Sequence, residues 1–290
     1  MLHELLNPRP ATCPGRPVGT RGSRGVRDGP CPTGSGFAGC GDGHCGRVFR
    51  ELVLVRHGES LGNQAAQQAA LAGAEVIVVG QRDADVGLSP TGFEQARALG
   101  AGLAPLLTDG TPVAVWSSPY ARALQTAQVA IEAAGADATV VFDERLRDRE
   151  LGVLDLLTRT GVARRFPLEA ERRQWLGKFY HRPPGGESWA DVALRLRSFL
   201  SDLPNATTAD RVVLVVHDAV VMLFRYILEG LDEHGLLQAG AAEPVRNASI
   251  TVLERAEGQH WRLQRYNDVA HLERHGAAVT EHGGEPDAAH

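Results

Sequence analysis

The chain has 290 residues, of which 43% are hydrophobic and 22% are charged, and its formal net charge is -5. These values are typical of a soluble globular protein with one large or two small domains, and they give no reason to expect nucleic acid or a membrane surface as a partner. No uninterrupted apolar stretch approaches the roughly 18 residues that are needed to span a bilayer. We therefore expect a cytoplasmic protein.

The first 50 residues have a composition of their own, with 11 Gly, 6 Pro and little aliphatic periodicity. Such a segment cannot bury enough apolar surface to offset the entropy that ordering would cost, so we predict a disordered extension over residues 1–50. It contains the cysteines of the chain, Cys13, Cys31, Cys40 and Cys45. Their spacings include no Cys-x-x-Cys pair, so a zinc site is not favoured even though His44 offers a further ligand.

Beyond residue 50, apolar runs alternate with amphipathic stretches. The apolar runs predict strands at 52–55, 113–116, 139–142, 212–216, 249–255 and 260–266. Apolar side chains spaced by three and four predict helices that begin near Thr91, Ser118 and Ser188. Glu94 lies three residues after Thr91, which is the spacing of a capping box. Ser118 is the expected cap of the second helix, and Gly135 marks its end.

The alternation of buried strands with helices predicts an α/β fold, specifically a three-layer α/β/α sandwich with a mostly parallel central sheet. We assign this domain to residues 51–272 and interpret 152–187 as an inserted helical cap that helps to enclose a substrate. The polar tail, residues 273–290, is expected to be frayed. The pattern of residues 64–87 is ambiguous.

The most informative stretch follows the first predicted strand, where the sequence Arg-His-Gly-Glu-Ser occupies residues 56–60 and Asn63 comes shortly after. In α/β sheets, ligand sites form at the carboxyl ends of the strands. The imidazole of His57 can attack phosphorus, and the guanidinium of Arg56 offers a rigid fork of donors to an anion. This combination of residues predicts phosphate chemistry.

Two further predicted strands end beside groups of the same kind. Arg122 lies in the first turn of the helix that follows strand 113–116, where free N–H groups and the helix dipole already favour an anion. His217 directly follows the most apolar strand, 212–216. With Arg56 and His57, these residues predict an anion site built on two histidines and two arginines.

These stretches resemble the motifs of the histidine phosphatase superfamily, branch 1, which also contains the cofactor-dependent phosphoglycerate mutases. The first motif is the Arg-His-Gly at 56–58, and the second is Ser-Ser-Pro-x-x-Arg-Ala-x-x-Thr-Ala at 117–127. His217 has the position of the second catalytic histidine. The family usually places a glycine next, where this chain has Asp218.

The acidic motif of the family, Leu-x-Glu-x-x-x-Gly, aligns on Leu146 and Gly152. Asp148 then occupies the position of the acid that protonates the leaving oxygen, and Glu150 lies two residues later. Aspartate is one methylene shorter than glutamate, so Glu150 remains an alternative donor, although Asp148 is favoured.

The resemblance implies a reaction as well as a fold. It implies that His57 attacks a phosphomonoester and forms a phosphohistidine, while Arg56 binds the phosphoryl oxygens together with Arg122 and His217. These four residues, together with Asp148 as the acid, are the predicted catalytic set. Neither a metal nor a cofactor is required.

The predicted substrate is a small phosphorylated metabolite of unidentified structure. Ser60 and Asn63 are predicted to contact it, as is Glu150 if it does not serve as the acid. The segment 183–188 is predicted at the rim of the pocket, where Ser188 caps its helix. The oligomeric state is not assigned.

Two alternatives to a phosphatase remain. In the phosphoglycerate mutases, the acidic motif continues as Tyr-Gly-x-Leu-x-Gly, whereas residues 151–155 here read Leu-Gly-Val-Leu-Asp, which favours hydrolysis over a mutase reaction. The other alternative is a non-catalytic phosphate-binding module. Members of that kind usually lose a histidine or the acid, and both His57 and His217 are present.

Overall fold

The computed structural model describes residues 49–255 and 260–282. The predicted N-terminal extension therefore lies outside the described residues, apart from its last two positions, and its cysteines lie wholly outside them. Among the described residues, no helix combines the length and the apolar character needed to cross a membrane.

The described residues form a six-stranded sheet in the order β3-β2-β4-β1-β5-β6. The strands are β1 (Glu51–Arg56), β2 (Val113–Ser117), β3 (Val140–Phe142), β4 (Arg211–Val216), β5 (Ile250–Arg255) and β6 (Trp261–Asp268). Parallel pairing joins β3, β2, β4 and β1, and antiparallel pairing adds β5 and β6 at the edge. The predicted α/β fold with a mostly parallel sheet is confirmed, and each predicted strand is present within two residues of its predicted bounds.

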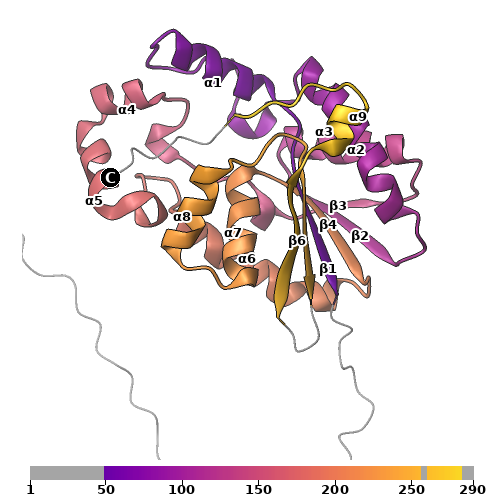
Figure 1. The fold of residues 1–290 in the computed structure, drawn as a ribbon. Helices are drawn as coiled ribbons and strands as arrows, with labels where there is room; N and C mark the ends of the chain where they lie inside the picture. Colours follow the sequence, from indigo (N-terminus) through magenta and orange to yellow (C-terminus); the bar gives the residue numbers. More distant parts are fainter. Residues whose placement is uncertain (1–48, 256–259, 283–290) are drawn as a thin grey trace, which may run out of the picture. The chain divides into compact units, whose positions relative to one another are not determined.

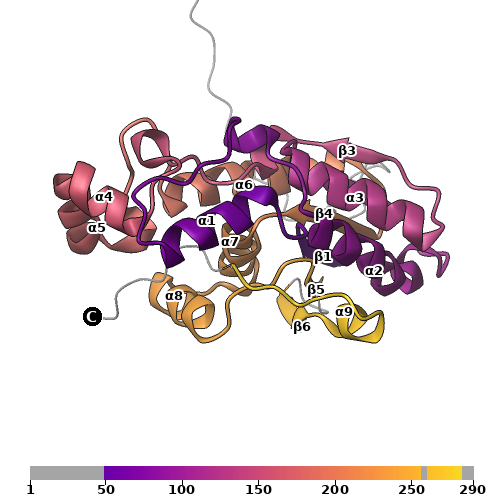
Figure 2. The same cartoon turned by 90° about the horizontal axis from the view of Figure 1, so that it is seen from above.

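Helices cover both faces of this sheet (Figures 1 and 2). They are α1 (Leu61–Leu71), α2 (Pro90–Leu107), α3 (Ala121–Ala134), α4 (Arg159–Arg165), α5 (Pro167–Tyr180), α6 (Trp189–Ala206), α7 (Asp218–Glu229), α8 (Glu233–Ala242) and α9 (Ala270–Arg274). Short 3-10 turns occur at Asp83–Asp85, Glu144–Leu146 and Gly152–Leu154.

Strand periodicity divides the core into two layers. Successive side chains of a strand point to opposite faces, so Leu52 and Leu54 of β1 pack with α6 and α7, while Val53 and Val55 pack with α2 and α3. The same division applies to β4. The continuous apolar sequence of both strands thus reflects burial on both faces of a parallel sheet.

The segment that we interpret as a cap contains α4 and α5, which lie beyond the carboxyl ends of the strands with α1 beside them (Figure 1). It is attached to the segment after α1, because Thr158 donates to the carbonyl of Ala74 at 2.6 Å and Glu75 forms ion pairs with Arg164 and Arg165. Residues 64–87, whose pattern is ambiguous, hold most of α1, the stretch that contacts this segment, and the 3-10 turn at Asp83–Asp85.

The two predicted caps at the starts of α2 and α3 are wrong. Helix α2 begins at Pro90 and is capped by Ser89, whose Oγ accepts from the N–H of Gly92 at 3.0 Å; proline fixes the first helical residue one position ahead of Thr91. Helix α3 begins after Tyr120 and has no side-chain cap, so the hydroxyl of Ser118 does not cap this helix.

The expectation of a frayed tail is also wrong for residues 275–282. The N–H of Asn247 donates to the carbonyl of Thr280 at 3.1 Å, and Gln95 Nε2 donates to the carbonyl of Ala278 at 2.8 Å. Backbone hydrogen bonds to buried partners hold this segment despite its polar composition.

Candidate active site

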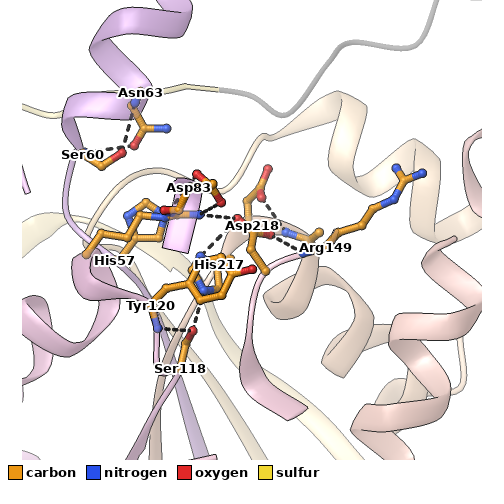
Figure 3. Close-up of polar contacts among 12 residues, drawn as sticks. His57, Ser60, Asn63, Asp83, Ser118, Tyr120, Arg149, His217 and Asp218 are labelled. Atoms are coloured by element: carbon orange, nitrogen blue, oxygen red, sulfur yellow. Dashed lines mark hydrogen bonds and ion pairs between the residues drawn. The ribbon is translucent and has the colours of Figure 1, made fainter. Parts of the chain in front are cut away.

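The predicted site residues meet where β1, β4 and β2 end. His57 follows β1 and His217 follows β4, and because these neighbouring strands are parallel, the two imidazoles lie side by side with ring centroids 5.1 Å apart (Figure 3). Arg122 lies in the first turn of α3, directly after β2, on the other side of β4. The sheet order therefore brings together residues that lie as much as 160 positions apart in the sequence.

His57 has the geometry of a nucleophile. Its Nδ1–H donates to the carbonyl oxygen of Gly58 at 2.7 Å, which leaves the lone pair on Nε2. Burial, together with the nearby charges of Arg122, His217 and Arg56, holds the pKa of His57 well below its usual range. The imidazole is therefore neutral at physiological pH. Residue 58 must be glycine, because a Cβ there would lie 2.7 Å from the carbonyl oxygen of Gly92.

His217 is fully buried and is held from two sides. Its Nε2 lies 2.8 Å from Ser118 Oγ, and its Nδ1 lies 3.2 Å from Asp148 Oδ2. Burial lowers the pKa of His217, although the carboxylate of Asp148 opposes the shift. The ring of Tyr120 packs edge-on against it, with centroids 5.4 Å apart.

Asp218, the residue that departs from the family's glycine, is the first residue of α7. Its backbone is helical, so this position does not need a glycine, and its carboxylate lies at the helix N-terminus, where the dipole favours negative charge.

Arg122 is buried, with 5% of its side chain exposed, and binds two carboxylates. Its Nη1 and Nη2 donate to the two carboxylate oxygens of Asp83 at 3.1 and 3.0 Å, and Nη2 also donates to Asp148 Oδ2 at 3.1 Å. Burial would lower the pKa of Arg122, but the two carboxylates raise it. The guanidinium is thus a fixed positive charge beside both histidines. Sequence patterns did not identify Asp83, because a single acid in a short irregular segment has no periodicity or spacing that marks it.

Asp148 reaches the centre of the site. One carboxylate oxygen, Oδ2, lies near Arg122 and His217, and the other accepts from the N–H of Arg149 at 2.9 Å. Burial would raise the pKa of the Asp148 carboxyl, but His217, Arg122 and this N–H together hold it well below its usual range. Glu150 lies further out, where its Oε1 accepts from Tyr120 OH at 2.7 Å.

The guanidinium of Arg56 is buried and is bound to backbone. It donates to the carbonyl oxygen of Val245 through Nη1 and to that of His282 through Nη2, the latter at 2.8 Å. No atom of the described residues accepts from its Nε. Burial lowers the pKa of Arg56. Two of its donors are thus already satisfied by carbonyl groups, which the sequence did not predict.

Ser60 and Asn63, the predicted substrate contacts, form the capping box of α1. Ser60 Oγ accepts from the N–H of Asn63 at 3.0 Å, and Asn63 Oδ1 accepts from the N–H of Ser60 at 3.1 Å (Figure 3). Asn247, which sequence patterns missed, donates from Nδ2 to the carbonyl oxygen of His57 at 3.1 Å. The capping box fixes the direction of the chain as it leaves His57, and a substrate contact by these two residues stays a prediction.

The described residues contain no group of three or more His, Cys, Asp and Glu side chains that could hold a metal ion. The groups that converge instead are two imidazoles, one guanidinium and one carboxylate, and this set is suited to binding and transferring a phosphoryl group.

Comparison with known proteins agrees with this geometry. Residues 52–269 match the family model of the histidine phosphatase superfamily (branch 1). The chain belongs to this superfamily. Its relatives include both phosphatases and phosphoglycerate mutases, so the protein is a phosphoryl-transfer enzyme.

Three curated relatives illustrate the range. The phosphoglycerate mutase-like protein 4 of Arabidopsis thaliana is 28% identical over 82% of this chain and 93% of its own length. The metal-independent phosphoserine phosphatase of the same plant is 28% identical over 77% of this chain and 83% of its own length. A 2,3-bisphosphoglycerate-dependent phosphoglycerate mutase of Methylobacterium radiotolerans is 32% identical over 63% of this chain and 81% of its own length.

Solved structures show the same fold. The structure described as mycobacterial hydrolase 1 has a TM-score of 0.60 and 29% identity, and the match covers 76% of this chain and 98% of that one. A mycobacterial glucosyl-3-phosphoglycerate phosphatase in complex with inorganic phosphate has a TM-score of 0.58 and 29% identity, over 77% of this chain and 99% of its own.

Proposed function

We propose that this protein is a metal-independent phosphomonoester hydrolase that acts on a small phosphorylated metabolite through a phosphohistidine at Nε2 of His57. The observation that carries the proposal is the state of His57: its Nδ1–H is committed to Gly58, its pKa is lowered, and its neighbours are His217 and Arg122. A neutral imidazole with a free Nε2 lone pair beside a fixed positive charge is suited to attack on phosphorus.

In the first step of the proposed reaction, the bond from Nε2 to phosphorus forms as the bond from phosphorus to the leaving oxygen breaks. Arg122 and His217 stabilise the equatorial phosphoryl oxygens, and Arg56 adds positive charge behind them. This electrostatic contribution is the main source of catalysis in phosphoryl transfer. In the second step, water attacks the phosphohistidine, and His57 is released as phosphate leaves.

We assign the proton transfers to Asp148. Its carboxyl donates a proton to the leaving oxygen in the first step and takes one from the attacking water in the second. The resting carboxyl has a lowered pKa, so the first step requires the incoming phosphate, which competes for Arg122, to raise it again. Glu150 is the second candidate, and its hydrogen bond from Tyr120 OH gives it a fixed position nearby.

The competing proposal is a phosphoglycerate mutase reaction, which the mutases among the relatives favour. A mutase retains the bisphosphate intermediate instead of passing the phosphoryl group to water. The sequence of residues 151–155 supports the hydrolase, since it lacks the Tyr-Gly-x-Leu-x-Gly continuation of the mutases. We also propose that residues 152–187, with α4 and α5, form a cap that helps to enclose the substrate.

The test is hydrolysis of p-nitrophenyl phosphate in EDTA by the wild-type protein and by His57→Ala. Turnover that survives EDTA and is lost in the variant supports the hydrolase. Absence of turnover, combined with labelling of His57 by 2,3-bisphosphoglycerate and conversion of 3-phosphoglycerate, would favour the mutase. Binding of phosphate with neither reaction would indicate a non-catalytic module.

A further inference from the structure

Asp148 and Glu150 lie in an irregular stretch, residues 147–151, between the 3-10 turns at Glu144–Leu146 and Gly152–Leu154. We call residues 147–150 the acid loop. A segment without regular secondary structure has no internal ladder of hydrogen bonds to fix its course. A proton donor needs a position defined to a fraction of an ångström. The contacts that hold the acid loop therefore determine where the carboxylate of Asp148 lies.

Arg195, in the second turn of α6, binds the backbone of this region. Its Nη1 donates to the carbonyl oxygen of Arg145 at 2.5 Å, and its Nη2 donates to that of Asp148 at 3.0 Å. The side chain is 10% exposed, so both bonds are shielded from water. Arg195 thus fixes the peptide that carries the proposed acid.

Glu187, the residue before the cap of α6, holds the other end of the loop. Its Oε2 accepts from the N–H of Glu150 at 3.2 Å, and its backbone N–H donates to the carbonyl of Glu150 at 2.9 Å. Its own carbonyl oxygen accepts from Arg149 Nε at 2.6 Å. Three separate groups of Glu187 therefore bind the acid loop.

The two side chains also bind each other. Arg195 Nε donates to Glu187 Oε1 at 2.9 Å, and Nη2 donates to Oε2 at 3.0 Å, which is the bidentate geometry that only an arginine offers to a carboxylate. Because the charges are paired, both can remain largely buried beside the loop. Arg147 adds an outer contact to the same carboxylate at 2.8 Å.

We propose that Glu187 and Arg195 are positioning residues for the proton donor: they clamp the peptides of residues 148–150 so that the Asp148 carboxylate points toward the histidines. The clamp acts on orientation directly, because Asp148 Oδ1 accepts from the N–H of Arg149, a group of the clamped backbone. This inference rests on the proposed function. It adds a role for two residues that the family's catalytic motifs do not include.

The test separates positioning of the acid from general stability by changing the leaving group. A nitrophenolate leaves without a proton, whereas an alkoxide needs one, so only alkyl esters depend on a well-placed acid. We would measure kcat/KM on p-nitrophenyl phosphate and on glycerol 2-phosphate for the wild type, Arg195→Lys and Glu187→Gln. Lysine keeps the charge of Arg195, but its single nitrogen carries three donors and cannot form the four hydrogen bonds that the guanidinium forms with Arg145, Asp148 and Glu187.

The matched control is Arg211→Lys. Arg211 is equally buried and also binds a backbone carbonyl and two carboxylates, those of Glu51 and Asp109, but it lies at the amino end of β4, opposite the site. This variant shows how much kcat/KM changes when a buried arginine network away from the site is lost. Thermal unfolding of each variant reports the stability change.

We expect Arg195→Lys and Glu187→Gln to lose about tenfold or more in kcat/KM on glycerol 2-phosphate and less than about threefold on p-nitrophenyl phosphate. The larger loss is a part of the roughly 100- to 10,000-fold rate enhancement that general acid catalysis supplies. The inhibition constant for vanadate should be unchanged in these two variants. In the control Arg211→Lys, kcat/KM should change by the same factor on both esters. Equal losses on the two esters, or no loss, would overturn the inference.

Failure of the proposed function would look different. If the wild type hydrolysed neither ester, the hydrolase proposal would fall, and the positioning role with it. If Arg195→Lys does not fold, Glu187→Gln carries the same comparison, because glutamine keeps the size of the side chain and an acceptor for the N–H of Glu150.

Discussion

The carboxylate of Asp83 binds the guanidinium of Arg122 through both of its oxygens, at 3.1 and 3.0 Å. This is the geometry in which an arginine binds a phosphoryl group. The side chain of Asp83 is 38% exposed, whereas that of Arg122 is buried, so Asp83 is the partner that can withdraw into solvent. We therefore expect Asp83 to compete with a bound phosphoryl group for the same donors.

Replacing Asp83 by asparagine should strengthen binding of phosphate and vanadate. The amide removes the negative charge that occupies Arg122, and we expect the inhibition constants to fall about three- to tenfold, which corresponds to about 1 kcal/mol for a partly exposed ion pair. The control is Asp85→Asn, because Asp85 lies on the same turn but pairs with the exposed Arg82 at 3.2 Å. Unchanged or weaker inhibition by vanadate in Asp83→Asn would refute the competition.

The pH dependence of the reaction follows from His57. Burial and nearby charges lower the pKa of His57 well below 6.5, so if His57 is the nucleophile, as proposed, its protonation should not reduce kcat/KM until the pH falls below that value. Titration of His57 by NMR checks this directly. Removal of the nearby charge in Arg122→Gln should raise the pKa of His57, and a wild-type titration near 6.5 would contradict the prediction.

The stability of the protein should fall in mild acid. His57, His181, His217 and His271 are buried, and burial lowers the pKa of each. The unfolded chain then binds more protons than the folded one below about pH 6.5, so the free energy of unfolding decreases as the pH drops, by up to about 1.4 kcal/mol per pH unit for each histidine.

Urea unfolding at pH 7.5 and at pH 5.5 measures this loss. Carboxylates with lowered pKa values, such as Asp148, affect the free energy of unfolding at lower pH. The change between pH 7.5 and pH 5.5 therefore reports largely on the histidines. His271 lies away from the site and binds the carbonyl of Ala248 at 2.9 Å, so His271→Gln should make stability less dependent on pH. Equal stability of the wild type at the two pH values would show that these histidines titrate normally.

The choice between the two proposed acids can be made with the same pair of esters. Asp148→Asn should reduce kcat/KM on an alkyl phosphate by about 100-fold or more while affecting an aryl phosphate much less, as expected for a general acid. Glu150→Gln should have the smaller effect, because its carboxylate is bound to Tyr120 OH at the edge of the site. The opposite ranking would make Glu150 the donor.

Sequence patterns predicted the parts of the site that follow strands. Arg56, His57 and His217 come directly after buried runs, and Arg122 opens the next helix, so their meeting follows from parallel pairing. Asp83 is different, because it reaches Arg122 from a short turn whose course depends on tertiary contacts. Patterns of local spacing carry no information about such a contact.

The wrong predictions have a common physical origin. Serine and threonine residues near a helix start are equivalent in sequence, and the actual cap depends on which hydroxyl is free to bind the helix N–H groups. At α2, Pro90 selects Ser89 over Thr91, and Ser118 instead contacts His217. The polar tail differs from its prediction because hydrogen bonds to backbone groups, which every sequence has, hold residues 278–282 in place.

The contacts of Arg56 connect the end of the described chain to the candidate active site. Its guanidinium binds the carbonyl of His282, and the same segment accepts from the N–H of Asn247 through Thr280. Opening of residues 278–282 would expose the N–H of Asn247 to solvent and free a donor of Arg56 at the same moment. The neighbouring N–H of Ala248 donates to the carbonyl of His57 and would remain protected. Amide hydrogen exchange at two adjacent residues can therefore report, without any substrate, how often the phosphate site and the chain end open together.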